Sequence, residues 1–231
     1  MSNPFDPAPL LGDLAITLDI DVLMGQHPGL PPREPVYVGA VANLRAALFD
    51  VRSGNDETLS KVDGVPVGAV DLRDPLGALA EIERLASLGV KAIRLFPEEQ
   101  AVQPDFPSVR RVAHAAAEAG LLILTGGDVR LFWRPLSGLR VVFLDTHFYH
   151  LGDFLLLLED EPGFHTCTRL LTSPDALEHV PAERLLFGSR SPYYEPLVPM
   201  LRLATSTLTR EEKAMVAGGN ARRLLGCHCD H

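Results

Sequence analysis

The feature that most restricts the fold of this chain is a repeated alternation of short apolar runs with helix-like stretches. Eight runs have the length and composition of β-strands, and each precedes a helix or a segment long enough to form one. Strands that alternate with helices pair in parallel through right-handed crossovers. The pattern therefore predicts a single (β/α)8 TIM barrel over residues 1–231, with a doubly wound open sheet as the alternative. The expected strands are residues 15–22, 36–40, 65–72, 90–97, 121–126, 140–146, 163–171 and 184–189.

Local signals mark where several helices begin and end. Asp74 is an N-cap residue followed by proline, which favours a helix start. Thr209 and Glu212 form the capping-box pattern that predicts the start of the last helix. Helices are also expected over residues 107–119 and 150–160.

The composition narrows the classes of protein to consider. Hydrophobic residues make up 46% of the 231 positions and the net charge is −9, so the chain can bury one sizeable core. An acidic chain without a basic run argues against nucleic acid or an anionic membrane as partner. No apolar run approaches the roughly 18 residues of a spanning helix, and residues 1–12 read as an extension, not a signal peptide. We therefore expect a cytoplasmic protein with a small-molecule ligand, and homo-oligomers remain possible.

The last five residues concentrate groups that bind metals. Cys227, His228, Cys229 and His231 are soft or borderline ligands that suit Zn²⁺ and other transition metals. Their spacing differs from the C-x2–4-C pattern of structural zinc sites, and chain ends are commonly mobile. We expect residues 227–231 to form a mobile tail with incidental metal affinity.

The first apolar run carries two carboxylates on one face. Residues 15–22 alternate between apolar and polar side chains, and the polar face includes Asp19 and Asp21. These two side chains are candidates for a polar site at the end of the strand. The alternative for Asp19 is an anchor that hydrogen bonds to neighbouring strands.

The last apolar run ends in a small-residue turn that aims an arginine at the mouth of a barrel. Gly188 and Ser189 follow the strand, and Arg190 comes next. Arg190 could bind an anionic ligand through two hydrogen bonds. The alternative is an internal ion pair with an acid such as Asp21 or Asp145.

Three further positions carry titratable groups near strand ends. Arg94 shares its face with Ala92 and Phe96, so it either reaches the mouth or forms a stabilising ion pair. His147 follows the sixth run beside Asp145, and an Asp–His contact could orient the imidazole for acid–base chemistry. The alternative is an inert loop histidine. His165 is a candidate for lining the site.

Three segments of the chain resemble the amidohydrolase-related metal-dependent hydrolases of the amidohydrolase superfamily. They are residues 65–97 (VPVGAVDLRDPLGALAEIERLASLGVKAIRLFP), 121–127 (LLILTGG) and 185–226, which begins LLFGS and ends NARRLLG. The resemblance implies a TIM barrel that binds substrate where the strands end. It also implies a divalent metal such as zinc that activates water.

The metal-ligand positions of that family are mostly substituted here. Its first strand usually ends in Asp-x-His-x-His, and the two histidine positions hold Asp21 and Leu23. The histidine of the fifth strand falls on Thr125. His147 matches the sixth-strand histidine if the register shifts by one residue, with Thr146 as the competing assignment.

The catalytic aspartate of that family falls on Arg190 in this chain. A guanidinium with a pKa above about 12 neither binds a metal nor acts as a base, and it repels a divalent cation. The sequence therefore predicts a degenerate or absent metal centre, with Asp21 and His147 as the weak remaining candidate ligands.

Two functions follow from these residues. The first is a hydrolase, or a lyase, that acts on a small anionic substrate at the carboxyl ends of the strands. The second is a non-catalytic relative that binds a metabolite or a protein partner. The candidate residues are Asp21, Asp145 and His147 for catalysis, and Asp19, Arg94, Thr125, His165 and Arg190 for substrate binding.

Overall fold

Eight parallel strands follow one another around a single sheet. The computed structural model describes residues 7–31, 33–34, 36, 38–173 and 175–227, and within them the strands pair in sequence order. Every neighbouring pair is parallel. The strands are β1 (Val22–Met24), β2 (Ala40–Asn43), β3 (Val65–Ala69), β4 (Ala92–Leu95), β5 (Leu122–Thr125), β6 (Val141–Phe143), β7 (Phe164–Cys167) and β8 (Leu185–Leu186).

The first and last strands meet, which closes the sheet. The amide of Ile20 donates to the carbonyl of Phe187 at 3.0 Å, and the amide of Leu23 donates to the carbonyl of Ser191 at 2.8 Å. Val22 also forms a parallel bridge with Ser191. An open sheet would keep these two edges apart, so the alternative of a doubly wound sheet is wrong. The predicted (β/α)8 TIM barrel is confirmed.

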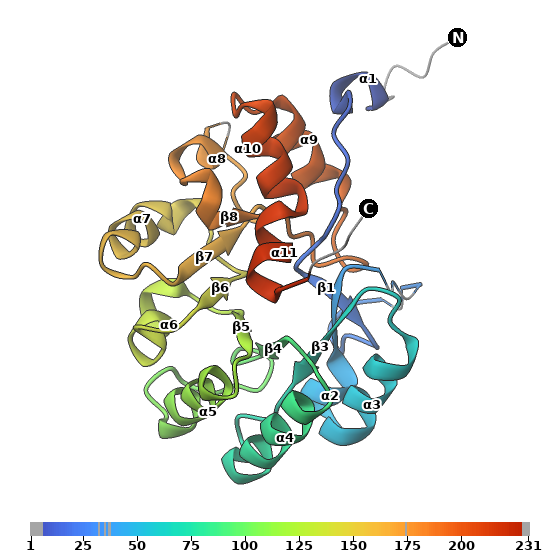
Figure 1. Ribbon diagram of the computed structural model, residues 1–231, viewed down its shortest axis with the longest axis vertical. Helices are drawn as coiled ribbons and strands as arrows, with labels where there is room; N and C mark the ends of the chain where they lie inside the picture. Colours follow the sequence, from blue (N-terminus) through green and yellow to red (C-terminus); the bar gives the residue numbers. More distant parts are fainter. Residues whose placement is uncertain (1–6, 32, 35, 37, 174, 228–231) are drawn as a thin grey trace.

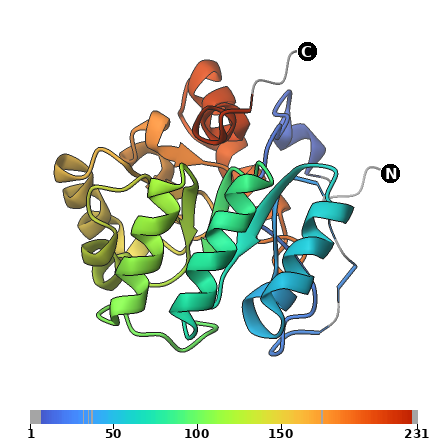
Figure 2. The same ribbon diagram turned by 60° about the horizontal axis from the view of Figure 1, so that its bottom comes forward.

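The helices surround the strands on the outside (Figure 1), and a second view shows several of them lying along the outer face of the sheet (Figure 2). None of the helices in the described residues combines the length and apolar character needed to cross a membrane. The helices are α1 (Ala8–Leu11), α2 (Leu44–Leu48), α3 (Val51–Lys61), α4 (Pro75–Ser87), α5 (Pro107–Glu118), α6 (Val129–Leu136), η1 (Phe148–His150), α7 (Leu151–Asp160), α8 (Ala176–His179), η2 (Ala182–Arg184), α9 (Leu197–Thr205), α10 (Arg210–Ala214), η3 (Met215–Gly219) and α11 (Asn220–Leu225).

The predicted helix starts are correct where side chains cap the backbone. The Asp74 carboxylate accepts a hydrogen bond from the amide of Gly77 at the start of α4. Thr209 and Glu212 form the reciprocal capping box of α10. Each cap satisfies backbone donors that have no partner within the helix, which is why these starts could be read from the sequence.

Two apolar layers hold the barrel together. Side chains that alternate along each strand point inward or outward in turn. The inward layer contains small residues such as Ala40, Ala42 and Ala92 beside larger ones such as Leu122. The outward layer packs the strands against the helices and forms the larger cluster. Both layers leave the carboxyl ends of the strands free to carry polar groups.

The predicted first and second strands were placed too early in the chain. Residues 15–18 lie outside the sheet, where the amide of Thr17 donates to the carbonyl of Ala217. Residues 19–21 precede β1 and reach its neighbours through single hydrogen bonds, such as that from the amide of Ala40 to the carbonyl of Asp19. The second strand begins after Gly39, whose φ of 106° suits glycine and interrupts the extended backbone.

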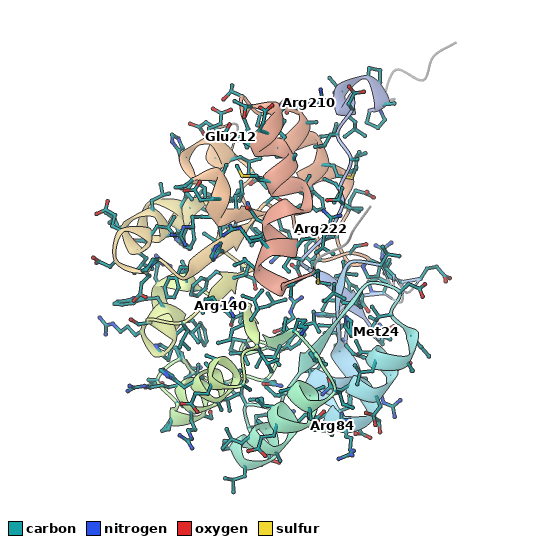
Figure 3. The ribbon with its side chains drawn as sticks, viewed as in Figure 1. Met24, Arg84, Arg140, Arg210, Glu212 and Arg222 are labelled. Carbon is teal, nitrogen blue, oxygen red and sulfur yellow. The ribbon has the colours of Figure 1, made fainter. Side chains whose placement is uncertain are left out.

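Arginines on the outer helices tie separate segments together (Figure 3). Arg222 on α11 donates to the Thr17 hydroxyl at 2.7 Å and to its carbonyl at 3.1 Å, which holds the amino-terminal segment against the last helix. Arg84 on α4 pairs with Glu81 at 2.6 Å and with Asp56 of α3 at 2.7 Å. These contacts hold the frame that carries the barrel mouth.

Candidate functional site

Five charged side chains from separate parts of the sequence meet inside the barrel. Asp21 precedes β1, Arg94 is on β4, and Asp145, Arg169 and Arg190 follow β6, β7 and β8. Parallel strands all end at the same edge of a barrel, so residues far apart in sequence converge there. Asp21 is fully buried and Arg94 is 1% exposed. We refer to these five side chains as the mouth cluster.

Asp21 is the centre of the mouth cluster. One carboxylate oxygen accepts a hydrogen bond from Nη1 of Arg94. The other lies 3.4 Å from Nε of Arg169 and 3.8 Å from Nε of Arg190. Burial on its own would raise the pKa of Asp21, but Arg94, Arg190 and Arg169 together outweigh it and hold the pKa below the ordinary value. Asp21 is therefore an ionised group, not a proton donor, at neutral pH.

Asp145 forms a second link between two of the arginines. Its Oδ2 accepts hydrogen bonds from Nη2 of Arg190 at 3.1 Å and from the amide of Gly127 at 3.1 Å. Its Oδ1 pairs with Nη2 of Arg169. Burial, followed by the charge of Arg190, lowers the pKa of Arg169 to about 10. Arg169 therefore stays charged at neutral pH.

Arg94 lies deepest in the barrel. Burial lowers its pKa more than the Asp21 charge raises it. Its guanidinium carbon lies 4.7 Å from the centre of the Phe96 ring, a cation–π contact. Among the described residues, Nε and Nη2 of Arg94 make no hydrogen bond, and the Nε atoms of Arg169 and Arg190 face Oδ2 of Asp21 without the geometry of a hydrogen bond. Buried donors of this kind are suited to an oxyanion.

The backbone of Arg190 is in a rarely used conformation. Its φ is 59°, in the left-handed region that non-glycine residues seldom adopt. Such a residue costs on the order of 1 kcal/mol or more and persists only where its surroundings hold it. Here its amide donates to the carbonyl of Asp21 at 2.5 Å. From this backbone the Arg190 side chain extends to Asp21 and Asp145 of the mouth cluster.

Two hollows open beside the mouth cluster. A cleft of about 410 Å³ is lined by Asp145, His147, Arg169 and Arg190, among others. A smaller hollow of about 100 Å³ lies on the other side of Arg190 and Tyr194, which line both. The Tyr194 ring lies 5.2 Å from the guanidinium carbon of Arg169. The cleft has the size of a site for a small ligand.

His147 is on the wall of the cleft, close to Asp145 in sequence. Its ring stacks on Tyr149, with centroids 4.7 Å apart and planes at 9°. Its Nδ1 accepts a hydrogen bond from the amide of Tyr149 at 3.3 Å. In the neutral ring this leaves the proton on Nε2. Three of the predicted residues, Asp145, His147 and Arg190, thus border one cleft.

Thr125 and His165 are two of the three predicted binding residues that lie outside the mouth cluster; the third is Asp19. The Thr125 hydroxyl donates to the carbonyl of Gly126 at 3.0 Å. His165 is near the beginning of β7, away from the mouth, and its Nδ1 lies 3.0 Å from the carbonyl of Gly163. Burial lowers the pKa of His165 to about 4, so the ring is neutral at physiological pH.

Asp19 joins β1 to the segment after β8. Its carboxylate accepts hydrogen bonds from the amide of Ser189 at 3.1 Å, from the Ser189 hydroxyl, and from the amide of Asp21 at 2.9 Å. Burial is the main influence on this carboxyl group and raises its pKa to about 7, although the Ser189 hydrogen bonds oppose the rise. These contacts are those expected of a group that anchors the barrel.

Arg169 was not among the predicted site residues. The sequence did contain a signal for it, because residues 165, 167 and 169 share one alternation face of the seventh run. A side chain two positions beyond Cys167 on that face reaches the mouth of the barrel.

The residues at the mouth do not fit the divalent metal that the resemblance implies. Among the described residues, no group of three or more His, Cys, Asp and Glu side chains is placed to hold a metal ion. Asp21 is in contact with three guanidiniums instead. Cys227 is described and its Sγ lies 3.9 Å from the carbonyl of Leu225, whereas the other tail candidates, His228, Cys229 and His231, lie outside the described residues.

The barrel is similar to solved structures of enzymes. It matches 5-carboxyvanillate decarboxylase from Sphingomonas paucimobilis with a TM-score of 0.61 and 20% identity, covering 83% of this chain and 79% of that one. It matches 5-carboxyvanillate decarboxylase from Novosphingobium aromaticivorans, complexed with manganese and 4-hydroxy-3-methoxy-5-nitrobenzoic acid, with a TM-score of 0.59 and 12% identity over 83% and 76%. A candidate amidohydrolase from Staphylococcus aureus matches with a TM-score of 0.60 and 15% identity, covering 83% of this chain and 88% of that one.

These likenesses show a fold shared with decarboxylases and a candidate amidohydrolase, which confirms the barrel that the resemblance implies. No protein-family model matches the chain. No curated protein matches it either.

Proposed function

We propose that this chain is an amidohydrolase-related TIM barrel that binds a small carboxylic acid at the barrel mouth and acts on it without a metal. The observation that carries this proposal is the convergence of Arg94, Arg169 and Arg190 on Asp21. With Asp145 included, three guanidiniums face two carboxylates, a formal charge of three minus two, or +1. Within these five groups one carboxylate ligand would balance that charge, while Glu98 and Asp128 line the outer part of the same cleft.

The charge of the mouth cluster opposes a metal and favours an anion. Guanidiniums within 4 Å of Asp21 would repel a divalent cation brought to the same carboxylate. The same guanidiniums have planar pairs of donors that match a carboxylate, and four of their buried nitrogens make no hydrogen bond among the described residues. Arginine thus takes over the electrostatic role that a metal has in related folds.

A lyase reaction fits this arrangement best. The two decarboxylases that share the fold act, by their names, on an aromatic carboxylate, which supports the same substrate class here. In a decarboxylation the bond between carbon and the carboxylate breaks, CO2 leaves, and a proton takes its place on that carbon. His147 lies on the wall of the cleft with Nε2 as its remaining proton-bearing atom, so it is the candidate donor.

A binding experiment tests the anionic ligand. Calorimetric titration with benzoate should give heat in the wild type and at least a tenfold weaker affinity in Arg190→Gln, because the lost charge–charge hydrogen bonds are worth about 1.5–3 kcal/mol. Arg111→Gln, an exposed change on α5, is the matched control and should bind as the wild type does. Equal binding of benzoate and its neutral amide would contradict the proposal.

A turnover screen tests the chemistry separately. Aromatic and aliphatic carboxylic acids are incubated with the protein and CO2 release is measured, alongside hydrolysis of esters, amides and lactones. We expect CO2 release that His147→Gln abolishes while benzoate binding remains. Benzoate binding without turnover of any compound would favour the non-catalytic alternative.

A further inference from the structure

The outer surface of the barrel has a groove between α5 and α6. It has a volume of about 570 Å³. Two large apolar side chains border it, Phe106 at 47% and Leu131 at 56% exposed. Exposed apolar side chains gathered around a concave surface are characteristic of an interaction site. We call this surface the α5–α6 groove.

The α5–α6 groove is basic, although the chain as a whole is acidic. Arg110, Arg130 and Arg134 line it together with one acid, Asp105. Arg130 is paired with Asp128 at 2.6 Å. Three arginines less these two acids leave a formal charge of +1, in a chain with a net charge of −9. The occupant that fits this groove therefore combines apolar and acidic side chains.

The next helix around the barrel has those properties. Leu156 on α7 is 66% exposed, and Asp153, Glu159 and Asp160 are exposed around it. Asp153 and Glu159 lie three positions before and after Leu156, and Asp160 lies four positions after it, so these acids border the helix face that Leu156 occupies. Gly152 lies on the same side with open space around its Cα, which allows a close approach. We call this surface the α7 ridge.

The groove and the ridge are neighbours on one side of the molecule, since α5, α6 and α7 follow one another around the barrel (Figure 1). A two-fold interface requires one surface that is complementary to itself. A basic apolar groove beside an acidic apolar ridge meets that requirement, because rotation by half a turn places each ridge opposite the other groove.

We propose that a second copy of this chain occupies the α5–α6 groove, so that two chains form a symmetric dimer in which each α7 ridge lies in the groove of the other. Leu156 would pack against Phe106 and Leu131, while Asp153 and Glu159 would face Arg110 and Arg134. The interface is on the outer helices and does not depend on the chemistry proposed for the barrel mouth.

Two charge-reversed variants of the full chain test this dimer. The groove variant is Arg110→Glu with Arg134→Glu, and the ridge variant is Asp153→Lys with Glu159→Lys. Each variant places like charges at both halves of a symmetric interface, so each alone should be a monomer by light scattering. Mixed together, they place opposite charges at both halves. The mixture should regain twice the 25.1 kDa mass of the chain.

A control variant and a check of folding accompany the measurement of mass. Arg52→Glu with Glu83→Lys, both exposed on α3 and α4, should keep the mass of the wild type. Circular dichroism of each variant verifies folding before the masses are compared. A monomeric wild type, a dimer that survives either reversal, or a mixture that stays monomeric overturns the proposal.

Discussion

Asp19 and Asp21 are two residues apart, yet the pKa values of their carboxyl groups are shifted in opposite directions from that of an ordinary aspartate. Asp19 is at the seam between β1 and the end of β8, where burial raises its pKa to about 7 despite hydrogen bonds from Ser189 and Asp21. Burial acts on Asp21 as well, but three guanidiniums reverse its effect and lower the pKa. Fixed positive charge, more than hydrogen bonding, decides whether a buried carboxyl group here stays ionised.

The largest effect on stability is expected when the charged carboxylate of Asp21 is removed. Asp21→Asn leaves Arg94, Arg169 and Arg190 buried without their shared carboxylate. Breaking a buried ion pair by removing one partner costs about 3–5 kcal/mol, and we expect a loss of this size in the free energy of unfolding. Urea unfolding at neutral pH measures it.

Asp56→Asn is the matched control for that prediction. Asp56 pairs with Arg84 on the surface, and 53% of its side chain is exposed. Exposed pairs contribute up to about 1 kcal/mol. Equal losses in the two variants would show that Asp21 is not the centre of a buried charge cluster.

A smaller loss, about 2 kcal/mol, is expected for Arg94→Met, because Asp21 keeps Arg169 at 3.4 Å and Arg190 at 3.8 Å. The lowered pKa of Asp21 contributes stability above its unfolded pKa, and that contribution disappears as the pH falls through the folded pKa. Loss of Arg94 raises the folded pKa, so acid unfolding should begin at a higher pH. Free energies of unfolding measured from neutral to acid pH test this prediction. Acid unfolding that begins at the same pH in the variant and the wild type would contradict it.

The raised pKa of Asp19 predicts the opposite dependence of stability on pH. The folded pKa of Asp19, about 7, is above its ordinary value of 3.8, so the folded chain holds the proton more tightly between those values. Stability should therefore fall as the pH rises through that interval. Asp19→Asn cannot titrate, so relative to the wild type it should gain about 2–3 kcal/mol between about pH 5 and pH 8. A pH-independent difference in unfolding free energy between the two proteins would contradict this.

The smallest effect is expected at the hydroxyl that serves Asp19. Ser189→Ala removes a hydrogen bond worth about 1 kcal/mol. That hydrogen bond also lowers the pKa of Asp19, so its loss should move the titration above 7. A carbon-detected NMR titration of the Asp19 carboxyl measures the shift, with Ser60→Ala on the surface of α3 as the control. An unchanged pKa of Asp19 in Ser189→Ala would show that the Ser189 hydroxyl does not lower it.

The fold was largely readable from the sequence because its signals are local. Caps at Asp74 and Thr209 are set by residues three positions apart, and parallel pairing follows from strand–helix alternation. The start of the barrel was not readable. Residues 15–21 alternate like a strand, but they bond to the segments around Phe187 and Ala217, near the other end of the chain.

The sequence indicated which residues form the site better than it indicated which of them contact one another. Strand ends pointed to Asp21, Arg94, Asp145 and Arg190, and these side chains do converge. Which acid meets which arginine depends on side chains brought together across the barrel, 73 positions apart for Asp21 and Arg94. Local pattern carries no such information, and for this reason the choice for Arg190 between ligand and internal acid stayed open.

In the proposed function, arginines and not a metal hold the anionic ligand at the barrel mouth. Calorimetric titration of benzoate into the full chain, before and after extensive treatment with a chelator, tests it most directly. We expect the same affinity in both titrations, because Arg169 and Arg190 supply the positive charge. Binding that disappears on chelation and returns with added manganese or zinc would contradict the claim.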